Sequence, residues 1–439
     1  MKLTRNFLLV ITTHFIFPFS VLAQNDSILS LSLKEAQDFA LNHFYVSRNA
    51  ELDVKAASNR VWESTAIGLP QVSINGQYQR YLDDTLPSFA IPAGPDGELM
   101  DVSIFERDNY SLTANVSQLI FSGEYIVGLQ AARIYKSLSE ESFEKTGIDI
   151  RQAVAGTYFT ILTLTENKKV LGKTLDNLRL ILDQTRKIYE AGMMEDTDVD
   201  QIDLTLRRTE NDMQSVSNLL ETMHKMLKYQ MGITTKDSIV LTENLNALVD
   251  VNTIDQSVYS FDLDNNIDYR ILNTNEQLQH LLLKREKSSV LPNVSGFYTY
   301  NAVLNQTPFT PPQHLVGLTA GWNIFESGMK TAKIAQARIE YEKAQNMKEQ
   351  EAERLILAAG QAQDNYITAL TKYYNEEQNF LLSEKVMNKT AEKYREGLVS
   401  SLDLSLTNSQ FLQAQISYTM AVQELLNSKI SLDKAFNKL

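Results

Sequence analysis

Residues 69–79 read LPQVSINGQYQ, and residues 291–300 read LPNVSGFYTY. Both stretches begin with Leu-Pro, continue through Val-Ser and then alternate apolar with polar side chains. Such alternation places one kind of side chain on each face of a β-strand. Because one strand pattern occurs twice, far apart in the chain, the sequence predicts a duplicated domain.

The same order of segments recurs along both halves of the chain. A strand-to-helix segment, IFSG, corresponds to IFESG in the second half, and a later segment, YEAG, corresponds to YREG. These four segments occupy residues 120–123, 324–328, 189–192 and 394–397. Each half is therefore expected to contain a helix, two strands joined by a loop, a long helix, a glycine-containing break and a further helix.

Four strands of about ten residues each are expected. They cover residues about 70–81, 110–120, 292–303 and 315–325. One face of each strand is apolar and the other carries small uncharged side chains, although Phe297 interrupts the pattern. This length and alternation suit tilted strands that cross a bilayer with their polar faces toward a wet lumen. A one-sided sheet of a globular protein explains any single strand equally well.

The links between paired strands, residues 82–109 and 302–314, are rich in proline and glycine. Both residue types interrupt helices and strand ladders. The two links are therefore predicted to be loops, which face the cell exterior if the strands form a barrel.

Residues 1–23 are typical of a secretory signal peptide. Lys2 and Arg5 precede an apolar stretch that ends in Val-Leu-Ala, a suitable cleavage site before Gln24. A buried N-terminal helix or a membrane anchor is the alternative. No later stretch contains the ~18 uninterrupted apolar residues of a membrane-spanning helix. The protein is expected to be exported, and four matching strands behind an export signal favour an outer-membrane barrel.

The composition excludes several classes of function. The chain of 439 residues contains 41 Lys and Arg against 54 Asp and Glu, and this acidic balance argues against nucleic acid as a partner. The chain contains no cysteine, which rules out disulfides, thiolate catalysis and cysteine-ligated metals. A lipid anchor on a mature N-terminal cysteine is likewise not expected. With 43% hydrophobic residues, the chain is not mostly disordered.

Two helices are expected to be much longer than those of a globular domain. They cover residues about 124–190 and 328–395, and the first spans roughly 100 Å at 1.5 Å per residue. Leucines at 171, 175, 178 and 182 step by four and three, the coiled-coil interval, although a plain helical-bundle core has a similar pattern. Residues 33–67 and 198–231 supply two shorter helices, which stacked end to end match one long helix.

These segments together resemble the TolC family of outer-membrane efflux proteins. The resemblance covers residues about 30–436 and rests on the order and duplication of motifs that are weak individually. Its pieces are LKEA at 33–36, both Leu-Pro-x-x-Ser strand starts, both strand-to-helix turns and both glycine-containing breaks. In this chain Glu124 replaces the second turn glycine of the family. Leu119 and Asn323 replace a proline that often precedes the turn.

The resemblance implies a mostly α-helical fold with a β-barrel part. Each protomer of a homotrimer contributes four strands to an outer-membrane barrel and its helices to a periplasmic tunnel. The chain divides into a first repeat, 24–235, an equatorial linker segment, 236–268, and a second repeat, 269–439. Residues 32–43, the segment 232–269 and the C-terminal end are implied to form a belt around the middle of the tunnel. Four strands cannot close a barrel with a lumen, so oligomerisation is also physically required.

The functional residues implied by the resemblance lie at the helix ends. The tips, residues about 191–198 and 396–402, meet a periplasmic adaptor protein, which links the trimer to an inner-membrane pump. The tip residues are Gly192, Met193, Gly397 and Leu398. The strand-to-helix turns are marked by Phe121, Gly123, Phe325 and Gly328.

Asp403 occupies the place of the aspartate that lines the narrow periplasmic entrance in the family, and Asp198 is its counterpart in the first half. In a trimer, one inward-facing acid forms a ring of three that favours cations. Leu406 stands where a second gate acid is expected, so a weak acidic constriction is predicted. The alternative is helix capping, because Ser400-x-x-Asp403 is typical of a capping box.

No catalytic, cofactor or metal-binding constellation is found in the sequence. The five histidines are scattered, and adjacent carboxylates are more typical of a solvated surface than of acid–base pairs. Methionines at 213 and 223 could suggest a copper path, but their heptad positions favour core packing. We therefore expect a passive exit duct for efflux or type I secretion in the outer membrane of a Gram-negative cell, with unknown cargo. A pore-less periplasmic coiled-coil scaffold or adaptor is the alternative, and an exported enzyme is a third.

Overall fold

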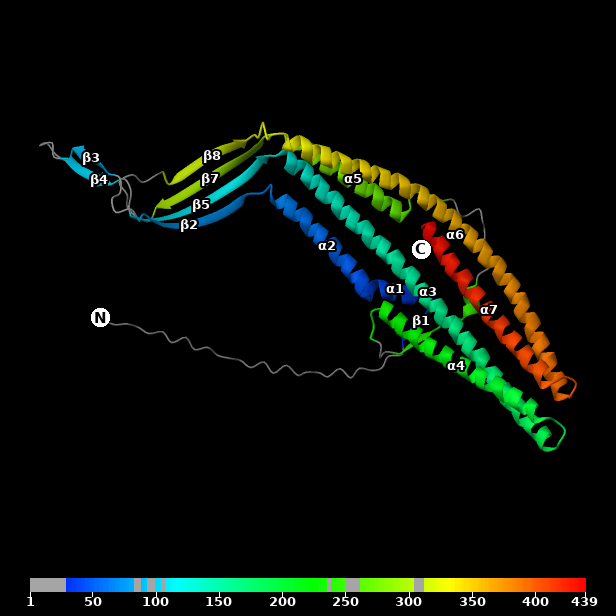
Figure 1. Ribbon diagram of the computed structural model, residues 1–439. Helices are drawn as coiled ribbons and strands as arrows, with labels where there is room; N and C mark the ends of the chain where they lie inside the picture. Colours follow the sequence, from blue (N-terminus) through cyan, green and yellow to red (C-terminus); the bar gives the residue numbers. More distant parts are fainter. Residues whose placement is uncertain are drawn as a thin grey trace, which may run out of the picture.

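The computed structural model describes residues 29–82, 88–92, 99–103, 107–234, 238–249, 261–303 and 312–439. The predicted signal peptide, residues 1–23, lies outside these ranges, as do parts of the two strand links and of the segment 236–268. The described chain is elongated, with strands at one end and long helices over the rest of its length (Figure 1).

Four antiparallel strands form the main sheet, in the order β2-β5-β7-β8. They are β2 (Gln71–Arg80), β5 (Asp108–Phe121), β7 (Asn293–Val303) and β8 (His314–Gly321). The two strands of the first half lie beside the two strands of the second half, because β5 pairs with β7. This pairing joins the two halves into one continuous sheet.

The register of the sheet places mainly apolar side chains on one face and mainly polar side chains on the other, with Phe297 and Leu315 as exceptions on the polar face. One row runs Val72, Val116, Tyr298 and Val316 across all four strands. The adjacent row carries Asn115 and Thr299, whose side chains share a hydrogen bond of 2.9 Å. The alternation read from the sequence therefore extends across the sheet, which has one apolar and one polar face.

The end of the fourth strand differs from the expectation. A strand was expected to 325, but β8 ends at Gly321, which pairs with Asn293, the first residue of β7. Strand β7 begins at Asn293, so beyond Gly321 β8 has no partner strand, and residues 322–326 belong to no ladder.

The link at 82–109 also differs, because part of it is a hairpin and not a loop. Strands β3 (Ser88–Pro92) and β4 (Leu99–Ser103) pair antiparallel beyond the main sheet (Figure 1). Pro92 ends its strand, where a missing N–H is tolerated.

The helix expected over 33–67 is divided in two. Helix α1 (Leu33–His43) ends at Phe44, whose ψ of 135° is extended, and α2 (Tyr45–Ala66) then begins. Ser32 caps α1 through a capping box with Glu35, so the start of the helix agrees with its sequence pattern.

Each long helix has two shorter helices along it. In the first half, α2 and α4 (Asp196–Gln230) pack against α3 (Gly123–Glu190). In the second half, α5 (Ile267–Ser288) and α7 (Ser401–Ala435) pack against α6 (Met329–Arg395). Figure 1 shows the resulting pairs descending from the sheet to two separate reversals. None of the described helices combines the length and the apolar character that crossing a membrane requires.

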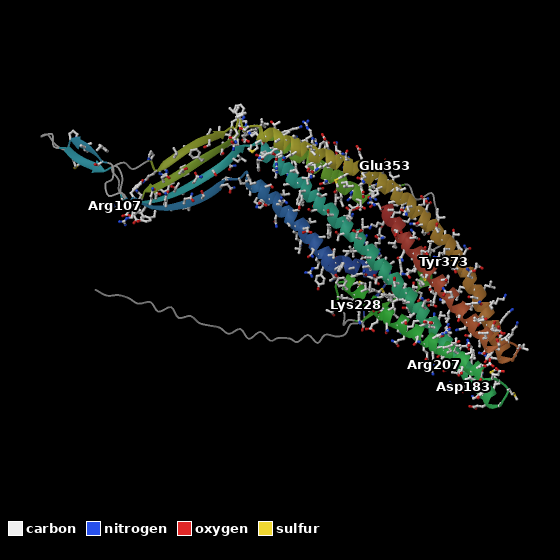
Figure 2. All side chains as sticks on the ribbon, in the orientation of Figure 1. Arg107, Asp183, Arg207, Lys228, Glu353 and Tyr373 are labelled. Atoms are coloured by element: carbon white, nitrogen blue, oxygen red, sulfur yellow. The ribbon has the colours of Figure 1, made fainter. Side chains whose placement is uncertain are left out.

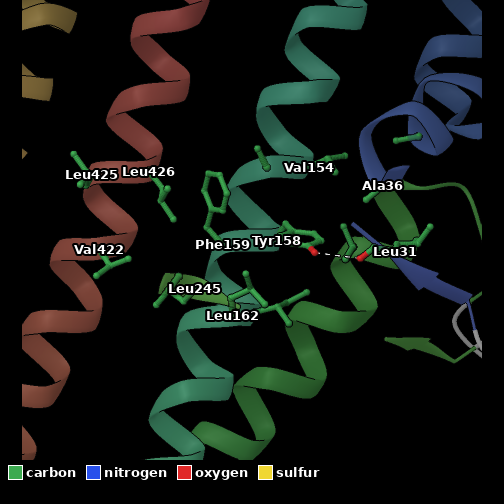
Figure 3. Close-up of a cluster of buried hydrophobic side chains, with 14 of the residues drawn as sticks. Leu31, Ala36, Val154, Tyr158, Phe159, Leu162, Leu245, Val422, Leu425 and Leu426 are labelled. Carbon is green, nitrogen blue, oxygen red and sulfur yellow. Dashed lines mark hydrogen bonds between the residues drawn. The ribbon is translucent and has the colours of Figure 1, made fainter. Parts of the chain in front are cut away.

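The largest core lies at mid-length, where the short helices meet. Strand β1 (Leu29–Leu31) pairs there with β6 (Ile239–Leu241), close to the 3₁₀ helix η1 (Leu245–Leu248). Tyr158 of α3 is fully buried, and its hydroxyl donates to the Leu31 carbonyl at 3.1 Å (Figure 3). Side chains from both halves pack around it, so this core joins the two halves below the sheet.

Candidate functional site at the helix reversals

Both long helices end in the same hydrogen-bonded glycine turn. The Gly192 amide donates to the Tyr189 carbonyl at 2.8 Å, and the Gly397 amide donates to the Tyr394 carbonyl at 3.0 Å. The two glycines have φ values of +75° and +70°, and nothing lies within 4 Å of an added Cβ. Glycine is therefore required at both reversals for its backbone conformation and not for space.

A large apolar side chain follows each of these glycines. Met193 is 81% exposed and Leu398 is 67% exposed. The backbone amide of each residue closes the turn by donating to a carbonyl five residues earlier, so its side chain is held outward at the extreme end of the molecule. The predicted docking residues are thus accessible, and their contact with an adaptor stays a prediction.

Asp403 is the N3 residue of a capping box at the start of α7. Its carboxylate accepts from the Ser400 hydroxyl at 2.7 Å and from the Ser400 amide at 3.1 Å. These two bonds, the side-chain bond first, lower the pKa of Asp403. Within one chain, Asp403 therefore caps helix α7, as the alternative interpretation of the sequence predicts. Its carboxylate is nevertheless exposed and ionised. Its place in a ring at the entrance stays a prediction.

Asp198 has a different environment from Asp403, although the two occupy equivalent positions in the two halves. It is half-buried in the first turn of α4, and the Ser401 hydroxyl donates to its carboxylate. Ser401 is itself buried in the first turn of α7. The structure thus places Asp198 between the two helical hairpins, where it joins them.

Two further pairs of hydroxyl groups connect the hairpins near the reversals. The Thr185 and Tyr394 hydroxyls lie 2.8 Å apart, and those of Thr205 and Ser405 lie 2.6 Å apart. These pairs could not be predicted from the sequence, because the two partners of each pair are far apart in the chain. One sequence signal did point to such a contact: Thr185 is a polar residue that continues the stripe of leucines at 171, 175, 178 and 182.

An apolar cluster surrounds these polar links. Leu178, Ile181 and Ile202 of the first hairpin pack with Leu404 of the second, all of them nearly or fully buried. Met213 packs against this cluster and Met223 packs against the mid-length core, so both serve as core residues. In the part of the chain that the structure describes, no group of three or more His, Cys, Asp or Glu side chains could hold a metal ion.

Two acids near the first reversal are paired with cations. Asp183 bonds Lys187 at 2.6 Å, and Asp203 bonds Arg207 at 2.9 Å. Figure 2 shows Asp183 and Arg207 close to this reversal, with Arg107 at the opposite end of the molecule. Because these two acids are matched locally, they add little to the negative charge near this reversal.

The two strand-to-helix turns use glycine for different reasons. A Cβ on Gly123 would lie 2.8 Å from Leu291 Cδ1, so that glycine allows α3 to approach the second half closely. Gly328 has open space around it but a φ of +84°. The Ser122 hydroxyl caps α3, whereas α6 has no side-chain cap at Gly328. The matched turns are therefore not structurally equivalent.

Exposed aromatic residues lie at both ends of the main sheet. Near the helices, Trp322 is 61% exposed and Phe325 is 85% exposed. Toward the link end, the Tyr78 and Tyr110 rings lie 5.0 Å apart, and the Tyr300 and His314 rings lie 5.1 Å apart. Two aromatic bands flanking an apolar face are typical of a sheet in a membrane. These bands could not be predicted from the sequence, because they form only when the four strands are aligned.

The outer membrane efflux protein family matches residues 47–228 and 287–438. The chain belongs to this family. The resemblance to TolC-type efflux proteins is thereby confirmed, as is the expected fold, mostly α-helical with a β part. No curated protein sequence matches the chain.

Solved structures of outer-membrane channels have the same fold as this efflux-family chain. The CmeC outer membrane channel of Campylobacter jejuni is 16% identical, with a TM-score of 0.75 over 92% of this chain and 85% of its own. VceC of Vibrio cholerae is 16% identical, with a TM-score of 0.72 over 92% and 95%. The open state of MtrE from Neisseria gonorrhoeae is 13% identical, with a TM-score of 0.71 over 92% and 88%.

Proposed function

We propose that three copies of this chain form a passive outer-membrane exit duct for efflux or type I secretion. The main sheet of each protomer contributes to a barrel, and the helices extend this barrel as a periplasmic tunnel. Cargo enters at the helix reversals and leaves through the sheet end.

The two-faced sheet with unpaired edges carries this proposal. Val72, Ile74, Val316 and Leu318 are 67% to 79% exposed on its apolar face, which suits contact with lipid. In the described chain, β2 and β8 are the outer strands, each bonded to one neighbour. Because open edges are not tolerated in lipid, pairing with further copies is required. Membership of an outer membrane efflux family supports the same assembly.

The remaining partners are inferred from the reversals. The exposed Met193 and Leu398 suit docking of a periplasmic adaptor, through which an inner-membrane pump supplies energy. Residues 1–23 have the pattern of a signal peptide, which suits export. The chain contains no cysteine, so a lipid anchor on a mature N-terminal cysteine is not part of this proposal. The Asp403 carboxylates of three chains suit a weak cation-selective constriction at the entrance.

A matched pair of strand variants tests the duct. Ile74 lies on the apolar face and Asn75 on the polar face of the same strand. Arginine on a lipid face near mid-membrane costs about 2–4 kcal/mol, whereas a lumen face tolerates it. We expect Ile74→Arg to abolish heat-modifiable trimers in outer-membrane fractions. Asn75→Arg should keep them and lower cation conductance in planar bilayers.

Three results would contradict the duct. The first is a wild-type product that fractionates as a soluble periplasmic protein, as the scaffold alternative requires. The second is a purified trimer that conducts no ions in planar bilayers. The third is the reverse pattern of the two arginine variants, which would place the polar face toward lipid.

A further inference from the structure

A groove lies between α2, α3 and α5, directly below the main sheet. Its volume is about 590 Å³. Leu119 of β5 and Asn293 of β7 line its upper end, and both belong to the polar face of the sheet. Since that face is turned toward the lumen in the proposed duct, the groove also opens to the lumen.

Two arginines from different helices line this groove. The Arg60 guanidinium of α2 lies 4.9 Å from the centre of the Tyr135 ring of α3. Arg285 of α5 donates from Nη2 to Glu286 at 2.9 Å. Its Nε is buried and has no acceptor among the described residues. The Arg285 side chain as a whole is 41% exposed, and a guanidinium can bind an oxyanion through two donors at once.

The rest of the lining is mainly apolar and aromatic. Leu129 of α3 and Leu278 and Leu282 of α5 contribute aliphatic surface, and Tyr125 contributes a second ring near the sheet. Glu124 is the acidic residue of the lining, and Glu286, which lies outside the lining, pairs with Arg285. The lining thus combines an apolar wall with guanidinium groups.

We infer that this arginine groove binds amphipathic anions on their way out of the duct. The ligand is an aromatic or aliphatic body that bears one sulfonate, carboxylate or phosphate group. The body lies on the leucines and Tyr125, while the oxyanion lies between Arg60 and Arg285. The inference rests on the proposed duct, because a lumenal groove requires a lumen, and it narrows the open question of cargo to one chemical class.

Channel block by naphthalene-2-sulfonate tests this inference. The compound is added on the extracellular side of wild-type trimers in planar bilayers, and the neutral naphthalene-2-sulfonamide serves as the matched probe. We expect concentration-dependent block by the sulfonate and little block by the sulfonamide. The double variant Arg60→Gln, Arg285→Gln should raise the half-blocking concentration about tenfold or more, since charge-assisted hydrogen bonds are lost.

Two further variants separate the groove from general charge effects. Lys284→Gln removes an exposed positive charge one residue from Arg285, outside the lining, and should change the half-blocking concentration about twofold or less. The double variant Arg60→Lys, Arg285→Lys keeps both charges. Its half-blocking concentration should lie between those of the wild type and of the glutamine variant. If the glutamine variant forms no trimer, this lysine variant still provides the comparison.

The outcomes distinguish the groove from the duct. A wild-type trimer without conductance contradicts the proposed function itself. A conducting trimer overturns the arginine groove alone if sulfonate and sulfonamide block it equally. The arginine groove is also overturned if both double variants have the half-blocking concentration of the wild type. It is likewise overturned if the sulfonate binds without altering the current, because the groove would then face away from the lumen.

Discussion

The Ser401 hydroxyl donates a hydrogen bond to the Asp198 carboxylate across 203 residues of sequence. The bond joins the first turns of α4 and α7, the two helices that return from the reversals. Asp198 is therefore part of the contact between the hairpins, whereas Asp403, its equivalent in the second half, is exposed. One duplicated position has thus acquired two physical roles.

Removing the links between the hairpins should loosen the entrance. The double variant Tyr394→Phe, Ser401→Ala deletes the hydroxyls that bond Thr185 and Asp198, at a cost of about 1 kcal/mol for each bond. The apolar cluster around them remains, so the trimer should still assemble. We expect a higher single-channel conductance in planar bilayers.

Ser409→Ala is the control for this prediction, because among the described residues the Ser409 hydroxyl bonds a carbonyl of its own helix and no group of the other hairpin. It should leave the conductance unchanged. An unchanged conductance in the double variant, with intact trimers, would show that these links do not hold the entrance.

Asp403 and Ser400 variants should separate charge from capping. Asp403→Ala removes the exposed charge and should reduce both cation selectivity and block by multivalent cations. Ser400→Ala removes the cap, at a cost of about 1 kcal/mol in stability, but keeps the carboxylate. Selectivity measured from reversal potentials should fall in the first variant and persist in the second. Equal selectivity in both variants and wild type would exclude Asp403 from the constriction.

Glycine substitutions in the second half should act with opposite signs. Gly397→Ala forces an L-residue to a φ of +70° and should destabilise by about 1 kcal/mol. Gly360→Ala lies within α6, with nothing within 4 Å of its added Cβ, and should stabilise by about 0.5–1 kcal/mol. Chemical denaturation of the purified protein gives both values. A loss of stability in both variants would mean that another chain packs on Gly360.

Charged substitutions at the tips should block efflux without unfolding the protein. Met193→Asp and Leu398→Asp alter strongly exposed side chains, so each should change stability by about 0.5 kcal/mol or less. We expect loss of cross-linking to the adaptor and loss of resistance in a drug-panel assay. Val240→Asp, at a half-exposed aliphatic residue near mid-length, is the control and should retain both. Normal cross-linking of both tip variants would move the docking surface elsewhere.

The ion pair between Glu276 and Lys348 should make stability depend on pH. It joins α5 to α6, and both side chains are largely buried. Its hydrogen bond lowers the pKa of Glu276 and raises the pKa of Lys348. The contribution of Glu276 is therefore present above the unfolded pKa of about 4.3 and is lost as the pH falls through the lower folded value.

Glu276→Gln should accordingly destabilise by about 1–2 kcal/mol at pH 7 and by less at pH 3. Glu340→Gln removes an exposed pair with Lys343 and should change stability at neither pH. Equal destabilisation by Glu276→Gln at pH 3 and pH 7 would assign the effect to packing.

Features that depend on local periodicity could be predicted from the sequence. The alternation around Val72 and Val294 identified strands, and the leucine stripe from Leu171 identified a coiled coil, because each pattern reports which side of an element avoids water. The capping box at Ser400 and the glycine turns followed from local backbone chemistry. The duplication of these local patterns was sufficient to indicate the family.

Only the tertiary structure decided which distant residues meet. Several features depend on which element lies beside another. They are the ends of β8 and of α1, the aromatic bands and the arginine groove. The same holds for Asp198: a capping-box motif identifies the partner of Asp403 in the sequence, but the partner of Asp198, Ser401, lies 203 residues away. Local patterns determine what each element is, whereas the roles of its exposed and polar residues are set by long-range packing.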